Sequence, residues 1–122
     1  TTLSHRDTKG IQNLDEIHRD NLKLLYKTGV KIAFGTDNMP TGVVEEAENI
    51  YRLNIFDNLT LIKIWTENTP QTIFLNRKIG ILKEGYEASF IALQGNPLED
   101  FSNIKKIQFL YKQGQFIKTR SN

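Results

Sequence analysis

The side chain with the clearest capacity for chemistry is the carboxylate of Asp37. It follows an apolar segment, residues 30–34, and the two turn residues Gly35 and Thr36. An acid at the carboxyl end of a parallel strand lies where α/β barrels collect their catalytic groups. Position and residue type alone also fit a turn or helix-capping carboxylate, because aspartate is common in both places. The segment therefore predicts either a catalytic acid or a structural one.

Other polar side chains near this acid have two interpretations as well. Asn38 is placed to contact a substrate, but an asparagine also favours the turn itself. Thr36 is expected to form a hydrogen bond within that turn. His18 falls on the polar side of a predicted helix, so we expect a surface histidine.

The elements that must position Asp37 are a helix and a short buried strand. Apolar residues at positions 14, 17, 22 and 25 have helical spacing. Asn13 is a suitable N-cap, with Glu16 in the position of a capping-box acid, and Gly29 can end the helix in a left-handed conformation. Residues 30–34 are nearly all apolar, as in a parallel strand that is covered on both faces.

Three further helices are predicted after Asp37. One carries apolar residues from Val43 to Tyr51. Asp57 is a plausible N-cap for the next, which should end near Asn68. Thr69 then caps a short helix whose first residue is Pro70, where the missing N–H is not needed.

The sequence pattern changes at about residue 79. From there on, glycines recur between short segments in which apolar and polar residues alternate, as in β-strands. Residues 88–93 predict one strand, and residues 107–111 face 115–117 across Gln113-Gly114, which is a hairpin turn signal. The chain therefore passes from α/β to all-β structure near residue 79.

Composition excludes several classes of function. The formal net charge of +2 comes from interspersed acids and bases, so there is no basic stripe for nucleic acid. The absence of cysteine excludes disulfides and thiolate chemistry. No apolar run is long enough to span a bilayer, and the polar start is no signal peptide. We expect no membrane partner. The compartment stays open, with the cytoplasm slightly favoured over a periplasmic or secreted location.

Five short motifs occur in a fixed order along the chain. A strand ends in Gly-Thr-Asp, a helix ends in Thr-x-Asn, and a glycine-punctuated segment, an Ala-x-Phe strand and a Gly-Asn-Pro-Leu turn follow. They are residues 35–37, 66–68, 79–85, 88–93 and 95–98. Together they resemble the C-terminal part of the amidohydrolase superfamily, in its imidazolonepropionase-like and prolidase-like (Xaa-Pro dipeptidase) branch.

The resemblance implies an α/β fold built from two partial domains. Residues 1–78 would be the end of a (β/α)₈ barrel, with Asp37 after its eighth strand. Residues 79–122 would be the C-terminal strands of the accompanying β-sandwich. A complete barrel needs about 250 residues, so a chain of 122 residues is expected to be a C-terminal fragment.

The same resemblance gives Asp37 two roles, as a ligand of a divalent metal, most commonly zinc, and as the proton acceptor for the metal-bound water. The substrate would be a small cyclic amide or a peptide-like molecule with a C–N bond. His5, near the mouth of the seventh strand, would touch substrate or else be an exposed loop histidine. The metal histidines of the family have no counterpart here, so we expect no bound metal and no hydrolysis by these residues alone. Ser89 replaces the family's usual aspartate in the sandwich.

A non-catalytic α/β binding or assembly module is the alternative, with Asp37 incidental. Under the fragment hypothesis, exposed apolar area and open strand edges predict self-association.

Overall fold

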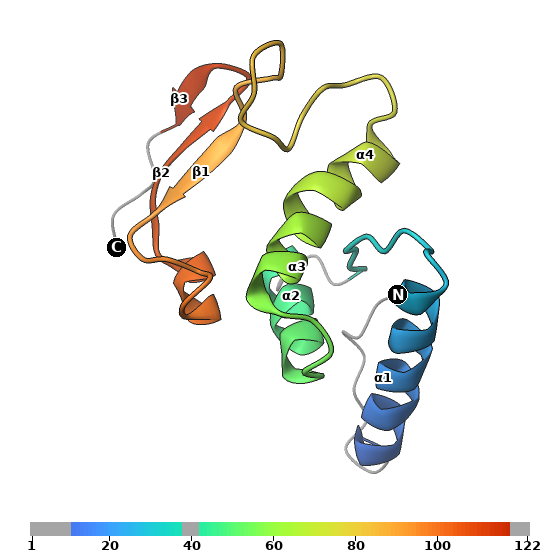
Figure 1. The fold of residues 1–122 in the computed structure, drawn as a ribbon. Helices are drawn as coiled ribbons and strands as arrows, with labels where there is room; N and C mark the ends of the chain where they lie inside the picture. Colours follow the sequence, from blue (N-terminus) through green and yellow to red (C-terminus); the bar gives the residue numbers. More distant parts are fainter. Residues whose placement is uncertain (1–10, 38–41, 118–122) are drawn as a thin grey trace. The chain divides into compact units, whose positions relative to one another are not determined.

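The computed structural model describes residues 11–37 and 42–117. The chain divides into two compact units, one ending at Thr69 and the other beginning at Pro70. Figure 1 shows the elements of each unit in chain order. The assignment of residues 1–78 to a barrel and 79–122 to a sandwich concerns a larger fold and stays a prediction. None of the described helices is long and apolar enough to cross a membrane.

The first helix, α1 (Ile11–Lys27), begins before its predicted cap, so Asn13 lies inside the helix and the expected capping box is wrong. Its end is as predicted. Gly29 has a φ of 79°, and the N–H groups of Gly29 and Val30 bond to the carbonyls of Tyr26 and Leu25 at 3.1 Å each. This pair of bonds is a Schellman motif, and it turns the chain sharply out of the helix.

The predicted strand over residues 30–34 is absent as a regular strand. Residues 31–36 have no regular secondary structure, and the described part of the first unit contains no other strand to pair with them. Ile32 and Phe34 are nonetheless buried while Lys31 is exposed. The alternation of an extended chain is therefore present without a strand ladder, because a ladder needs a neighbouring strand.

The helices after Asp37 are α2 (Gly42–Arg52), α3 (Asn58–Lys63), a π-helical stretch η1 (Ile64–Asn68) and α4 (Thr69–Ile73). Asp57 caps α3 as predicted, because its Oδ1 accepts a hydrogen bond from Thr60 N at 2.7 Å. Hydrogen bonds from Thr60 hold the pKa of Asp57 below its ordinary value.

The predicted boundary near Asn68 coincides with the end of η1, and the predicted short helix is α4, but the helical backbone continues without a break from residue 58 to residue 73. Thr69 is not a cap but a helical residue, with φ −61° and ψ −53°. Pro70 cannot donate to a carbonyl one turn earlier and its ring crowds that carbonyl. The wider π turn directly before it accommodates this defect.

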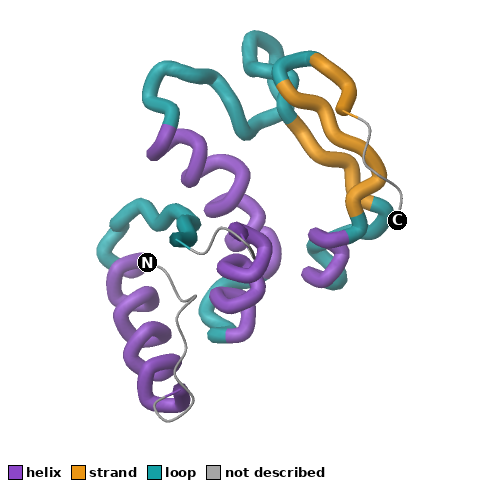
Figure 2. Tube along the Cα trace, turned by 180° about the vertical axis from the view of Figure 1, so that it is seen from behind, coloured by secondary structure: helices purple, strands orange, loops and turns teal. Residues whose placement is uncertain are grey.

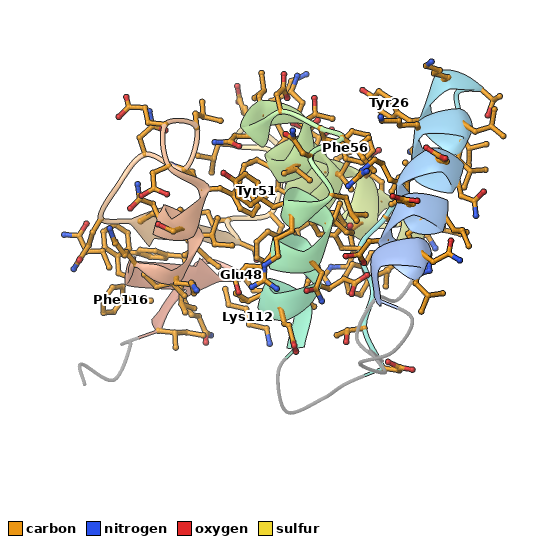
Figure 3. The ribbon with its side chains drawn as sticks, turned by 90° about the horizontal axis from the view of Figure 1, so that it is seen from below. Tyr26, Glu48, Tyr51, Phe56, Lys112 and Phe116 are labelled. Atoms are coloured by element: carbon orange, nitrogen blue, oxygen red, sulfur yellow. The ribbon has the colours of Figure 1, made fainter. Side chains whose placement is uncertain are left out.

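The core of the first unit is formed mainly by α2 and α3 and the segments around them. Leu22 is the single buried residue among the four apolar positions predicted for the core face of α1; Leu14, Ile17 and Leu25 are at least 40% exposed. Tyr26 and Phe56 form an edge-to-face pair with ring centroids 5.0 Å apart (Figure 3). The buried apolar residues are Leu22, Ile32, Phe34, Ala47, Ile50, Leu53, Phe56, Leu61 and Ile64.

The second unit is built on a three-stranded antiparallel sheet, with the strand order β1 (Phe90–Leu93), β2 (Ile107–Lys112) and β3 (Gln115–Ile117) (Figure 2). The predicted hairpin is confirmed. Gln113 and Gly114 have φ values of 53° and 77°, as a two-residue type I′ turn requires. Tyr111 pairs in register with both Phe90 and Phe116, so aromatic rings gather on one face. A 3₁₀ turn, η2 (Phe101–Lys105), buries Phe101 and Ile104.

Candidate active-site carboxylate

Asp37 lies at the end of the extended segment and is exposed. The buried Phe34 precedes it by three residues, with the exposed Gly35 and the half-buried Thr36 between them. The carboxylate is therefore presented at the surface by a segment whose preceding residues are fixed in the core. This is the arrangement that the sequence predicts for a catalytic acid, except that no strand ladder supports it.

A side chain from the helical run supports this segment instead. The backbone N–H of Phe34 donates to Thr69 Oγ1 at 2.9 Å, a buried hydrogen bond. Thr69 Oγ1 in turn donates to the carbonyl of Ile64 at 2.8 Å. The backbone N–H of Thr69 bonds to the same carbonyl across the π turn. Phe34 is thus tied to the point where the π stretch meets α4.

Ring packing holds the same residue from a second direction. The rings of Phe34 and Trp65 have centroids 6.0 Å apart at an angle of 43°. Phe34 is 4% exposed, so both its side chain and its N–H are removed from water. The helical run 58–73 therefore fixes the start of the turn that carries Asp37.

The other predicted site residues cannot be placed beside this carboxylate. His5 and Asn38 lie outside the described residues. His18, which was expected on the surface, is half-buried, and its Nδ1 is buried with no hydrogen-bond partner among the residues that the structure describes. It lines a hollow of about 280 Å³, and the described residues in its walls lie on α1 and do not include Asp37.

A metal centre is not assembled within residues 11–37 and 42–117. These residues contain no group of three histidine, cysteine, aspartate or glutamate side chains that could hold a metal ion. A catalytic zinc takes three protein ligands, and Asp37 offers carboxylate oxygens from one side chain. This part of the chain fits the role of one ligand and does not fit the role of a complete site.

A second polar cluster lies in the other unit. Arg77 forms a forked ion pair with Glu87, with the shortest N–O distance at 2.7 Å, and its guanidinium lies 4.5 Å from the centre of the Phe74 ring. Ser89 Oγ donates to Glu87 at 2.5 Å and accepts from Gln113 N at 3.0 Å. Arg77 first, and then Ser89, holds the pKa of Glu87 below its ordinary value. These groups bond to one another and to the hairpin turn, which indicates a structural role.

Thr69 is the residue that sequence reasoning missed. Its position before Pro70 favoured a helix cap, and the π turn that redirects its hydroxyl leaves no clear mark in the sequence. A signal for this role was available. A buried backbone N–H such as that of Phe34 needs an acceptor, and a threonine hydroxyl in a nearby helix can supply one.

Comparison with known proteins decides the family. The amidohydrolase family model matches residues 11–117. The chain belongs to the amidohydrolase family. The resemblance inferred from the five motifs is confirmed, and so is its prolidase-like branch among the structural neighbours.

Individual relatives share this region over part of their length. Ochratoxinase of Aspergillus niger is 35% identical over 113 residues, which is 88% of this chain and 24% of the relative. Its crystal structure superposes with a TM-score of 0.74 at 34% identity, covering 86% of this chain and 25% of that one. A Xaa-Pro dipeptidase with methionine bound in its active site gives a TM-score of 0.67 at 29% identity, with coverages of 83% and 25%.

A prolidase complexed with N-methylphosphonate-L-proline shares the fold, with a TM-score of 0.71 at 24% identity, and the match covers 84% of this chain and 26% of that one. The amidohydrolase chain thus spans about a quarter of the length of each of these relatives.

Proposed function

We propose that this chain is the part of a metal-dependent hydrolase that supplies Asp37 to the active site. The observation that carries the proposal is the exposed carboxylate at the end of a segment anchored in the core, inside the region that matches the amidohydrolase family. We also propose that residues 1–78 are the end of a (β/α)₈ barrel and that residues 79–122 are the C-terminal strands of the accompanying β-sandwich.

The chemistry assigned to Asp37 is that of a ligand and a proton acceptor. A divalent metal, most simply zinc, would supply Lewis acidity and lower the pKa of water toward about 7. The Asp37 carboxylate takes the proton of the attacking water and delivers it to the leaving nitrogen of the scissile C–N bond. The remaining ligands come from residues other than those described, because the described ones hold no further metal-binding group.

The family resemblance implies two substrate classes, a small cyclic amide and a peptide-like amide. The comparisons favour the second, because a Xaa-Pro dipeptidase is among the relatives above 25% identity. We therefore propose a peptide-like C–N bond as the preferred substrate.

The experiment uses the full natural chain that carries this sequence, purified with its metal. Xaa-Pro dipeptides, N-acyl amino acids and a cyclic amide are incubated separately, and release of the amine is followed. We expect hydrolysis of a peptide-like substrate, at least tenfold loss after treatment with a chelator, and recovery on addition of zinc. Undiminished hydrolysis after metal removal contradicts the metal-dependent mechanism. Failure to cleave all three classes with metal bound favours the non-catalytic module.

The isolated 122 residues are proposed to be inactive and to self-associate. The exposed apolar residues Leu14, Ile17 and Leu25 on α1 support association in water. Light scattering at increasing concentration tests this, with Ile17→Glu as the variant that should reduce the mass. A stable monomer at all concentrations contradicts it.

A further inference from the structure

We propose that Thr69 is a positioning residue for Asp37, acting through the backbone of Phe34. The inference rests on the proposed function of Asp37 and adds a residue that neither the motifs nor the family comparison assigns. Thr69 does not touch the reacting atoms. Its hydroxyl fixes the origin of the three-residue segment that ends in the carboxylate.

The direction of each hydrogen bond follows from the donors available. Phe34 N–H can only donate, so Thr69 Oγ1 is its acceptor at 2.9 Å. The single hydroxyl hydrogen of Thr69 is then free to point at the Ile64 carbonyl, 2.8 Å away. A hydroxyl is required at this position, since a group that only donates or only accepts would leave one of the two bonds unmade.

The π turn explains why this hydroxyl reaches the segment. Each residue of an α-helix rotates the next side chain by about 100°, so one extra residue in a turn changes which residue faces a given neighbour. The stretch Ile64–Asn68 contains this wider turn and ends directly before Thr69. Single π turns are frequent at functional sites, where they reorient one side chain.

The short distance along the chain carries the effect to Asp37. Phe34 is buried and its ring contacts Trp65, and its N–H adds a hydrogen bond that orients the backbone at this point. Gly35 follows with no side chain to restrain it, and nothing lies within 4 Å of the position that a Cβ would take. The anchor at Phe34 is therefore a buried contact only three residues before the carboxylate. A shift of about 1 Å in a catalytic group can lower turnover up to about a hundredfold.

The test compares four variants in the full natural chain with its metal. Thr69→Val keeps the shape and removes the hydroxyl, whereas Thr69→Ser keeps the hydroxyl. Thr66→Val is the matched control, because Thr66 Oγ1 donates to the Ile62 carbonyl at 2.9 Å in the same helical run but is exposed. Thr69→Cys, with its weak sulfur acceptor, serves if the valine variant does not fold.

Turnover and local exchange are measured together. We expect Thr69→Val to lower kcat about tenfold or more with KM within threefold, while Thr69→Ser and Thr66→Val stay within about threefold of the wild-type kcat. Amide exchange at Phe34 should accelerate at least tenfold in Thr69→Val and stay unchanged in Thr66→Val. Thr69→Cys should fall between serine and valine. A valine variant with faster exchange at Phe34 and wild-type kcat overturns the proposal, and so does a serine variant as impaired as valine.

Asp37→Asn distinguishes a failure of the Thr69 proposal from a failure of the function proposed for Asp37. If Asp37→Asn retains wild-type turnover, the proposed function itself fails. If Asp37→Asn is inactive and Thr69→Val behaves as wild type, the positioning role alone fails.

Discussion

Extended backbone is stabilised in two different ways in the two units. In the unit that begins at Pro70, strands β1 to β3 pair in an antiparallel ladder whose register shifts once, between Ala92 and Leu93, and the Gln113-Gly114 turn connects β2 to β3. In the unit that ends at Thr69, the segment before Asp37 has no ladder among the described residues, and a threonine hydroxyl accepts the Phe34 N–H. The sheet is supported by main chain, whereas the candidate catalytic segment is supported by side chains.

This difference matters for function because side-chain support can be altered without remaking a sheet. A ladder distributes its hydrogen bonds over many residues, so each contributes a small share. The segment before Asp37 is held at Phe34 by individual side-chain contacts, among them those of Thr69 and Trp65. Departures from local folding rules are expected at functional sites, and here the departure and the candidate carboxylate fall in the same place.

The largest effect on stability is expected from the helical core of the first unit. Leu61 in α3 is 0% exposed, so Leu61→Ala should lower the free energy of unfolding by about 3 kcal/mol through lost burial and a cavity. Leu59→Ala in the same helix removes a side chain that is 49% exposed and should cost about 0.5 kcal/mol.

Hydrogen exchange shows where the Leu61→Ala effect is felt. If the units are separate cooperative structures, protection at β1 to β3 stays at its wild-type level while the helices exchange faster. Equal loss of protection in both regions would contradict the distinction between them.

The second prediction compares one glycine from each unit. A Cβ at Gly95 would meet the side chain of Asn103 at 2.5 Å, and Asn103 is held by a bond to the Asn96 carbonyl at 3.0 Å. Gly95→Ala should therefore destabilise the protein by about 2 kcal/mol. Gly35→Ala meets nothing within 4 Å and has no left-handed φ, so it should be neutral or stabilising by up to about 1 kcal/mol. Thermal unfolding of both variants measures this, and the reverse order would show that the contact at Asn103 is wrong.

The smallest effect concerns the pH dependence of the second unit. The pKa of Glu87 lies below its ordinary value of 4.5 in the folded chain, because Arg77 and then Ser89 bind its charged form. A lowered folded pKa adds stability above pH 4.5 and loses it as the pH falls through the folded pKa. Glu87→Gln should therefore melt below wild type at neutral pH, with the gap closing as the pH falls below 4.5 and through the folded pKa.

Glu84→Gln removes an exposed carboxylate from the same unit and controls for the loss of one charge. A difference between Glu87→Gln and wild type that stays constant across this pH range would contradict the role of the Arg77–Glu87 pair.

The sequence predicts the second unit better than the first for a physical reason. In the second unit, the Gln113-Gly114 turn and the strands over residues 107–117 follow from local signals, and each forms the expected structure. The Asp57 cap is a local signal of the same kind in the first unit, and it is also confirmed. The strand over 30–34 fails as a regular strand because its definition depends on a partner elsewhere in the chain. The apolar face of α1 was only partly predictive, since Leu22 is buried and Leu14 is 42% exposed.

The candidate site likewise contains one residue that the sequence pointed to and one that it did not. The apolar segment and the turn before Asp37 were enough to select this carboxylate as the candidate. The family followed from the order of five motifs. Thr69 could not be inferred, because its role depends on a π turn and on a contact with Phe34, 35 residues away in the chain. Contacts at that separation are set by packing, which a local pattern does not encode.

The most direct test of the central claim is the turnover of Asp37→Asn in the full natural chain with metal bound. Asp20→Asn, which removes an exposed carboxylate from α1, is the matched control. If Asp37 is the ligand and proton acceptor, Asp37→Asn should lower kcat by about 10³-fold, while the kcat of Asp20→Asn stays within twofold of wild type. An Asp37→Asn enzyme within threefold of the wild-type kcat would contradict the account and leave Asp37 as a turn residue.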